Sequence, residues 1–250
     1  MYKKCVLPEE IEKLPLGCFK GKIVVVDKPG IEYLAAVAYL KRQKVIGFDT
    51  ETRPVFSPGA HHNKVALLQL SGRDKAFLFR LNKMKLGRML CSVLSDPDIL
   101  KIGAASGDDV HGLQKRANFK GRGFVDLQQI AWRWGIRDKS VKKLAANILG
   151  VKISKTQQLS NWEAEELSVA QKKYAATDAW VCLEMYEKLM RSEEHPLSRE
   201  ELNPPQPQQK PAGECAADKD APEKPKSRRR KRHRKPIGKD GENNTEERKG

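Results

Sequence analysis

Residues 45–51 have the sequence Val-Ile-Gly-Phe-Asp-Thr-Glu, an apolar run that ends in two acidic residues. The apolar part predicts a buried strand, and side chains two positions apart on a strand point to the same face of a sheet. We therefore expect Asp49 and Glu51 to leave the carboxyl end of a core strand together, where open α/β sheets bind their ligands. Two carboxylates in that position supply half of a site for a hard cation, although the spacing alone also fits exposed acids at a strand end.

A long helix is predicted from about residue 169 to 190, and it carries Tyr174 and Asp178. Side chains four positions apart lie on the same face of a helix, one turn apart. Several alanines beside them leave the helix surface uncrowded, so that another element or a substrate can approach closely. In isolation, this spacing also fits a half-buried tyrosine and a solvated aspartate.

Two adjacent aspartates follow a predicted short strand at residues 99–102 and a turn of small residues at 103–107. An aspartate at the start of a helix can cap its free N–H groups and interact favourably with the helix dipole. Both Asp108 and Asp109 fit that role. We assign Asp108 to the cap and Asp109 to the acidic site.

Four carboxylates in one place raise each other's pKa and destabilise a fold unless positive charge compensates them. A pair of divalent cations provides that charge, and can activate a water on one side of a phosphorus atom and stabilise the leaving oxygen on the other. A tyrosine phenol beside the site can position that water by hydrogen bonding. Together, the three acidic segments predict a site for two divalent cations that is suited to phosphodiester chemistry.

The apolar patterns predict one α/β domain over residues 23–195, after an N-terminal extension of residues 1–22. Three neighbouring strands joined by short turns favour an antiparallel part of the sheet. Residues 124–126 fit either a further strand or the entry to a helix. The five predicted strands are residues 23–26, 45–49, 65–70, 76–79 and 99–102, and the shorter helices are 29–42, 86–94 and 108–117.

The chain has 250 residues and a net charge of +16. Such an excess favours a polyanionic partner, with nucleic acid ahead of an anionic membrane surface. The five cysteines are scattered and form no CxxC pair, which favours a reducing compartment over a disulfide framework. We find no signal peptide and no apolar run near the roughly 20 residues that span a bilayer. We therefore expect a soluble cytoplasmic protein, or a nuclear one in a eukaryote.

Residues 204–250 are rich in Pro, Gln, Lys, Arg and Glu and contain almost no large apolar side chain. Such a segment cannot bury enough surface to offset the entropy of ordering, so we predict a disordered basic tail. The tail can bind nucleic acid without sequence preference, direct a eukaryotic protein to the nucleus, or act as a solubilising extension. We favour nucleic-acid binding, because it agrees with the acidic site. The residues expected to make this contact are Arg228, Arg229, Arg230, Lys231 and Arg232.

The three acidic segments, in this order, resemble the motifs of the DEDD superfamily of 3′-to-5′ exonucleases. Residues 48–51, 102–113 and 174–178 resemble its first, second and third motifs. The tyrosine at position 174 is similar to that of the tyrosine-bearing branch, which includes ribonuclease D and the exonuclease domain of the Werner helicase. The resemblance covers roughly residues 20–190.

This resemblance implies a ribonuclease H-like fold, in which helices flank a mixed five-stranded sheet. It implies that Asp49, Glu51 and Asp178 hold the cation that activates water, and that Asp49 bridges to a second cation. Asp109 would reach that second cation through a water, and Tyr174 would orient the attacking water. The implied cations are Mg²⁺ or Mn²⁺. The implied reaction releases nucleoside 5′-monophosphates from the 3′ end of DNA or RNA.

A second hypothesis is a catalytically silent nucleic-acid-binding protein with the same fold, and the five intact site residues argue against it. A third is a protein held at a membrane surface by its basic tail, which ranks last because no amphipathic apolar face accompanies the tail. Outside the site, we expect Asp126 to have a structural role such as capping. We expect Trp162 to close the core under the long helix. Five basic residues could bind phosphates at the rim of the cleft, but lysine is usually exposed in any case, so we leave them out of the predicted site: Arg53, Lys139, Lys142, Lys143 and Lys155.

Overall fold

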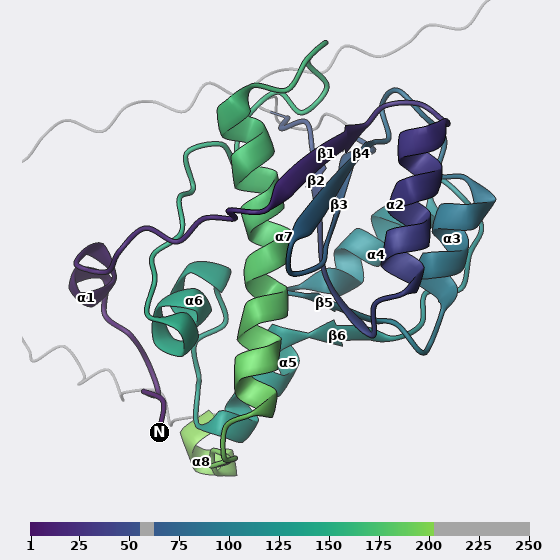
Figure 1. The fold of residues 1–250 in the computed structure, drawn as a ribbon. Coiled ribbons are helices and arrows are strands. Elements are labelled where there is room, and N and C mark those ends of the chain that lie inside the picture. Colours follow the sequence, from purple (N-terminus) through teal and green to yellow (C-terminus); the bar gives the residue numbers. More distant parts are fainter. Residues whose placement is uncertain (56–62, 203–250) are drawn as a thin grey trace, which may run out of the picture. The chain divides into compact units, whose positions relative to one another are not determined.

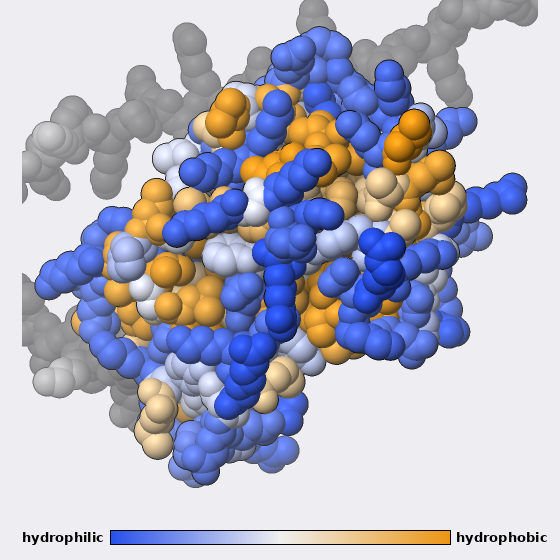
Figure 2. Space-filling view, in the orientation of Figure 1, coloured by the Kyte–Doolittle hydropathy of each residue, from blue (hydrophilic) through white to orange (hydrophobic). Residues whose placement is uncertain are grey.

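The computed structural model describes residues 1–55 and 63–202 (Figure 1). The tail at 204–250, including the basic run at 228–232, lies outside the described residues, so its predicted disorder stays a prediction. No helix within the described ranges is both long and apolar enough to cross a membrane. The face drawn in Figure 2 is largely hydrophilic, with separate hydrophobic patches between the polar side chains.

Six strands form one mixed sheet in the order β1-β4-β3-β2-β5-β6. Strand β3 is antiparallel to both of its neighbours, whereas β1 runs parallel to β4, and β2, β5 and β6 run parallel to one another. This confirms the α/β class and the antiparallel part of the sheet. The bounds are β1 (Lys22–Val26), β2 (Val45–Thr52), β3 (Val65–Ser71), β4 (Lys75–Arg80), β5 (Leu100–Gly103) and β6 (Phe124–Asp126).

The expected number of five strands is wrong, because β6 is a sixth. This strand has three residues and pairs in parallel with β5 at the edge of the sheet, with Val125 opposite Ile102. So short a segment has no periodicity of its own that separates a strand from the entry to a helix. Its place in the sheet is decided by the pairing with β5, which the sequence does not display.

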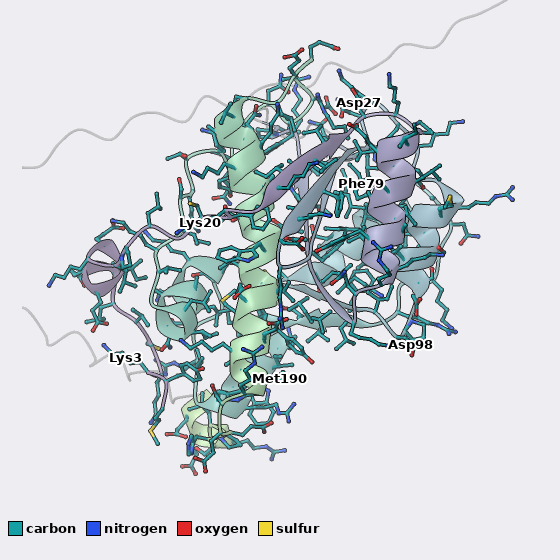
Figure 3. The ribbon with its side chains drawn as sticks, viewed as in Figure 1. Lys3, Lys20, Asp27, Phe79, Asp98 and Met190 are labelled. Carbon is teal, nitrogen blue, oxygen red and sulfur yellow. The ribbon has the colours of Figure 1, made fainter. Side chains whose placement is uncertain are left out.

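Helices cover both faces of the sheet (Figure 1). On one face, α2, α3 and α4 pack against the strands and form a cluster of apolar side chains with Phe48 and Phe79. Phe79 lies on the side of α2 in Figure 3. Its ring meets the Tyr33 ring edge-on, with the ring centroids 6.2 Å apart. Helices α6 and α7 lie on the other face. The bounds are α1 (Pro8–Glu12), α2 (Ile31–Lys41), α3 (Arg88–Ser95), α4 (Ser106–Gln114), α5 (Leu127–Ile130), α6 (Val141–Leu149), α7 (Val169–Met190) and α8 (Arg199–Leu202).

Helix α7 crosses the sheet and contacts strands β1 to β5. It begins at a capping box, in which Ser168 Oγ accepts from the backbone N–H of Gln171 and the Gln171 side chain accepts from the backbone N–H of Ser168. Because these bonds satisfy donors of the first turn, they fix where the helix starts. The start of α7 in turn sets the positions of Tyr174 and Asp178 along the sheet.

The beginning of the chain lies against α7 and the segments beside it. The backbone N–H of Phe19 donates to Thr177 Oγ1 at 3.0 Å, and Thr177 donates to a carbonyl one turn earlier in α7. The Tyr2 hydroxyl is 2.7 Å from Ser192 Oγ, just beyond the end of α7. The N-terminal residues therefore contact this helix both at its middle and just beyond its end.

Candidate active site

Gly47 lies in the middle of β2, where α7 passes over the strand. A Cβ atom at this position would stand 1.8 Å from the carbonyl oxygen of Ala179, so a larger residue does not fit without moving the helix. The side-chain position of Gly47 therefore faces α7, and by the alternation of the strand those of Asp49 and Glu51 face it too. The close approach of the helix brings Asp178 to the same two acids.

Three carboxylates meet between β2 and α7. One oxygen from each of Asp49, Glu51 and Asp178 lies within 4.8 Å of the other two. Oxygen ligands on opposite sides of Mg²⁺ stand roughly 4 Å apart, so one cation is able to contact all three side chains after small adjustments. Carboxylate oxygens are the ligands that such hard cations prefer, so the donor set fits a divalent cation.

The three carboxyl groups have raised pKa values. Burial is the largest cause for each group. The pKa of Asp49 lies well above its ordinary value, because the charges of Asp178 and Asp109 add to the effect of burial. Burial and the neighbouring acids raise the pKa of Glu51 to about 10, whereas the pKa of Asp178 rises only to about 7, because Tyr174 and Lys155 favour its ionised form. A bound divalent cation would remove this electrostatic cost, which is a second reason why the site fits one.

Tyr174 lies one turn before Asp178 on the same face of α7, as the spacing predicts. Burial is the main cause that raises the pKa of its phenol, and the carboxylates of Asp178 and Glu51 raise it further. The Tyr174 ring packs against Trp162, with the centroids 5.9 Å apart, and Trp162 is fully buried. The phenol is therefore held at the edge of the acidic cluster in its neutral form.

Asp109 lies beside the cluster rather than within it. It is in the first turn of α4, and its Oδ1 accepts a hydrogen bond from Thr50 Oγ1. Burial raises its pKa to about 6, and its charge in turn raises the pKa of Asp49, so the two groups interact electrically. Thr50 stands between Asp49 and Glu51 in sequence, and it thereby connects the first acidic segment to the second.

The prediction that Asp108 caps this helix is wrong. Helix α4 begins at Ser106 with Ala105 as its N-cap, and no side chain caps it. Ala105 has φ +59°, a left-handed conformation that is rare for alanine, and the small-residue turn hides the true start of the helix. Asp126 holds this turn instead, because its Oδ1 accepts from the backbone N–H groups of Ala105 and Gln128 at 3.0 and 2.9 Å. The predicted structural role of Asp126 is therefore confirmed.

A cavity of about 230 Å³ opens onto the cluster. Asp49, Glu51, Tyr174 and Asp178 line it on the side of the sheet and α7. The loop after α6 contributes further polar side chains, among them Ser154, Lys155 and Gln158. Lys155 also lowers the pKa of Asp178 through its charge, so the ammonium group faces the acids. Of the five basic residues considered for the rim, only Lys155 lines this cavity, whereas Lys142 pairs with Glu12 and Lys143 with Asp138.

A larger groove of about 880 Å³ begins on the other side of Thr50. It runs between the end of β2 and α4, with Asp109 on one wall. Three of its lining side chains are basic, namely Arg53, Lys64 and Lys115. The acidic cluster thus lies where a small acidic cavity meets a wider groove that is lined by these three basic side chains and by two acids, Asp108 and Asp109.

Sequence reasoning missed three residues that shape this site, namely Gly47, Thr50 and Cys182. Cys182 lies one turn after Asp178 and lines the same cavity. A glycine inside an otherwise apolar strand often marks a close backbone approach, so Gly47 carried a usable signal. The contact of Thr50 with Asp109 joins residues far apart in sequence, and no local pattern indicates it.

The fold and the acidic cluster together define the class of enzymes with a ribonuclease H-like exonuclease fold. Residues 29–193, well over half of the chain, match the family described as 3′-5′ exonuclease. The chain belongs to this family of phosphodiester hydrolases.

Among its relatives, exonuclease 3′-5′ domain-containing protein 2 of Drosophila melanogaster is 36% identical over 152 residues, which cover 59% of this chain and 26% of the relative. The bifunctional 3′-5′ exonuclease/ATP-dependent helicase WRN of Mus musculus is 30% identical over 75% of this chain and 14% of the relative. The chain therefore spans only 26% and 14% of the length of these two relatives.

Solved structures show the same fold. The Nibbler exonuclease domain of Aedes aegypti has a TM-score of 0.59 and 26% identity, and the likeness covers 70% of this chain and 91% of that one. Ribonuclease D of Escherichia coli, an exoribonuclease, has a TM-score of 0.60 and 22% identity over 68% of this chain and 44% of that one. The expected ribonuclease H-like architecture is therefore confirmed.

Proposed function

We propose that this chain is a metal-dependent exonuclease that hydrolyses the last phosphodiester bond at the 3′ end of a nucleic acid and releases nucleoside 5′-monophosphates. The observation that carries the proposal is the convergence of three half-buried carboxylates, from β2 and α7, in a cavity. Three acids held so close together destabilise the fold, and a function that needs them accounts for their presence. Membership of the exonuclease family supports the direction of cleavage.

Asp49, Glu51 and Asp178 are proposed to hold divalent cations, Mg²⁺ or Mn²⁺, with Asp109 contributing from the neighbouring helix. Two such ions would supply electrostatic stabilisation for the attacking and the leaving oxygen of an in-line displacement. The charges of both Asp178 and Asp109 raise the pKa of Asp49, which supports its proposed position shared by both ions. The carboxylates would bind the cations in their ionised form. The positive charge of the cations would offset the mutual repulsion that raises the pKa values of the carboxyl groups.

Tyr174 is proposed to orient the attacking water. Its raised pKa keeps the phenol protonated at neutral pH, so it can donate or accept a hydrogen bond but does not act as a base. Trp162 supports the ring from behind. A tyrosine in this position also supports placing the chain in the tyrosine-bearing branch of the superfamily.

The substrate is proposed to be a nucleic acid with a free 3′ end. Lys155 faces the acidic cavity and is placed to contact a phosphate oxygen there. The basic groove beyond Thr50 is proposed to receive the strand on the 5′ side of the cleaved bond, since Arg53, Lys64 and Lys115 match its phosphates. The basic run at 228–232 is proposed to add contacts without sequence preference.

The test is a time course on 3′-labelled and 5′-labelled single-stranded DNA and RNA, with Mg²⁺, Mn²⁺ or EDTA. The full chain should give a ladder that shortens from the 3′ end, and EDTA and Asp178→Ala should each abolish it. Asp98→Ala is the matched control, because Asp98 is exposed and far from α7 (Figure 3), and it should cleave like the unaltered chain. Binding of nucleic acid without cleavage under either cation would replace the proposal with a catalytically silent binding protein.

A further inference from the structure

Gln69 lies in the middle of β3, and its side chain does not reach solvent. Both of its amide atoms, Nε2 and Oε1, are buried and have no hydrogen-bond partner among the described residues. An unpaired buried amide is costly, because it has given up its hydrogen bonds to water without replacing them. Most buried polar groups in folded proteins are paired, so this amide requires an explanation.

The sheet places Gln69 directly opposite Asp49 in the ladder between β2 and β3. Directly opposed residues of an antiparallel pair have their side chains on the same face, with Cβ atoms about 4.5–5.5 Å apart. That face is covered by α7, because Gly47, two residues before Asp49, lies against the carbonyl of Ala179. A glutamine side chain is long enough to bring its amide to the Asp49 carboxylate across this distance.

On β2, Glu51 shares this face, but it pairs with Leu67 and is therefore a diagonal neighbour, farther from Gln69 than the directly opposed Asp49. The remaining neighbours of Gln69 along its own strand and on β4 do not offer it a free partner. On the far side it pairs with Leu78 of β4, which is apolar. Along β3, Leu67 is a buried apolar residue, and the Ser71 hydroxyl already donates to the carbonyl of Gly72 at 2.8 Å. Within the described part of the chain, Asp49 is therefore the acceptor that the ladder presents to the amide.

We propose that Gln69 is a positioning residue, whose Nε2 group donates a hydrogen bond to the Asp49 carboxylate when that carboxylate holds a divalent cation. A carboxylate has about four lone-pair positions, so it can bind a cation and still accept from an amide. A donor on the outer side of such a ligand fixes its orientation and strengthens cation binding. This inference rests on the proposed function, because it concerns the same site.

The test measures Mn²⁺ binding to the full chain without nucleic acid, from the electron paramagnetic resonance signal of free Mn²⁺. Gln69→Met keeps the length of the side chain and removes the amide. The Kd for Mn²⁺ should rise about ten- to a hundredfold, the usual effect of losing a hydrogen bond to a cation ligand. The melting temperature in EDTA should stay the same or rise, because an unpaired amide has left the core.

Ser71→Ala is the matched control, on the same strand and the same face, and its Kd should stay within twofold of the unaltered chain. Gln69→Leu also removes the amide and adds no charge or cation ligand, so it should weaken Mn²⁺ binding as well. It carries the comparison if Gln69→Met does not fold.

A folded Gln69 variant that binds Mn²⁺ as tightly as the unaltered chain would overturn this inference alone. Failure of both variants to fold in EDTA would also overturn it, since the amide would then support the fold without any cation. An unaltered chain that binds no Mn²⁺ would overturn the proposed function as well.

Discussion

Gly47 sets how close α7 comes to β2, so a single methyl group at this position should have a large effect. In Gly47→Ala the new Cβ meets the carbonyl oxygen of Ala179. The helix must move away, and overpacking of this kind costs about 1–3 kcal/mol of stability. Because Asp178 moves with the helix, metal-dependent cleavage should be lost as well. Urea unfolding and the cleavage assay measure the two effects.

Gly30→Ala is the control for this prediction. Gly30 has an extended backbone, and nothing lies within 4 Å of the position that its Cβ would take. Its free energy of unfolding should change by no more than about 0.5 kcal/mol, and cleavage should persist. Equal stability of the two alanine variants would show that α7 tolerates the extra volume at Gly47.

Tyr174 should act through its hydroxyl alone. Tyr174→Phe keeps the ring that packs on Trp162, so the melting temperature and the KM should change little. The kcat should fall by about 10²-fold or more, since the water loses the group that orients it. Steady-state kinetics on a labelled oligonucleotide separate kcat from KM. Tyr39→Phe, which removes a hydroxyl on α2 that bonds Asp74, should leave kcat unchanged.

At the scale of elements, the contact of β2 with α7 makes stability depend on pH when no cation is bound. A carboxyl group whose pKa is higher in the folded than in the unfolded chain holds more protons when folded, so the free energy of unfolding falls as pH rises. For Asp178 this fall runs from its ordinary value of 3.8 to about 7. For Glu51 it runs from 4.5 to about 10. The chain in EDTA should therefore melt at a higher temperature at pH 5 than at pH 8.

Calorimetry in EDTA, repeated with Mg²⁺, checks this prediction. The added cation should raise the melting temperature at pH 8, where the carboxyl groups carry most charge. Asp178→Asn should also raise it in EDTA at pH 8, because one buried acid is removed, while activity is lost. A melting temperature that rises steadily from pH 5 to pH 8 in EDTA would contradict the idea that these acids destabilise the fold.

The sequence predicts the elements of this site better than it predicts how they meet. The alternation of β2 places Asp49 and Glu51 on one face, and the helical spacing of Tyr174 and Asp178 places both on one side of α7. These are local periods, and the structure follows them. The start of α4 could not be predicted, because Ala105 adopts a conformation that alanine rarely takes and Asp126 stabilises it from another strand.

Pairing between strands decides the features of the fold and the site that the sequence does not predict. Residues 124–126 form a strand because β5 pairs with them. The unpaired amide of Gln69 can be related to the acidic cluster only because the sheet places it opposite Asp49. The count of strands and the surroundings of Gln69 are therefore absent from any single stretch of sequence. The acidic residues of the site could be predicted from the sequence, because their chemistry requires particular residue types at fixed spacings.

At the scale of the whole molecule, positive charge should govern substrate affinity. Deletion of residues 204–250 should weaken binding at moderate salt and reduce the slope of log K against log salt concentration, since fewer phosphates are neutralised. The kcat on a short oligonucleotide should remain, because the acidic cluster lies outside the deleted segment. Fluorescence anisotropy across a salt series measures the slope. An unchanged slope would show that the tail does not contact the substrate.

Lys64→Glu combined with Lys115→Glu tests the basic groove in the same assay. The pair should raise the KM for long strands and leave a dinucleotide unaffected, because only a long strand extends into the groove. Lys41→Glu combined with Lys188→Glu is the matched control, because it changes the net charge equally at two lysines that do not line the groove. An equal rise in the KM for long strands and for the dinucleotide would show that the strand does not extend into this groove.

The acids of this site come from opposite ends of the folded chain, Asp49 and Glu51 early and Asp178 late. A ribosome that has made the first hundred residues has released two of the three clustered carboxylates, but not the helix that brings the third. A nascent chain from which Asp178 has not yet emerged therefore lacks the assembled centre, and so does any fragment truncated before α7. The centre can therefore assemble only after all six strands of the described sheet have been made.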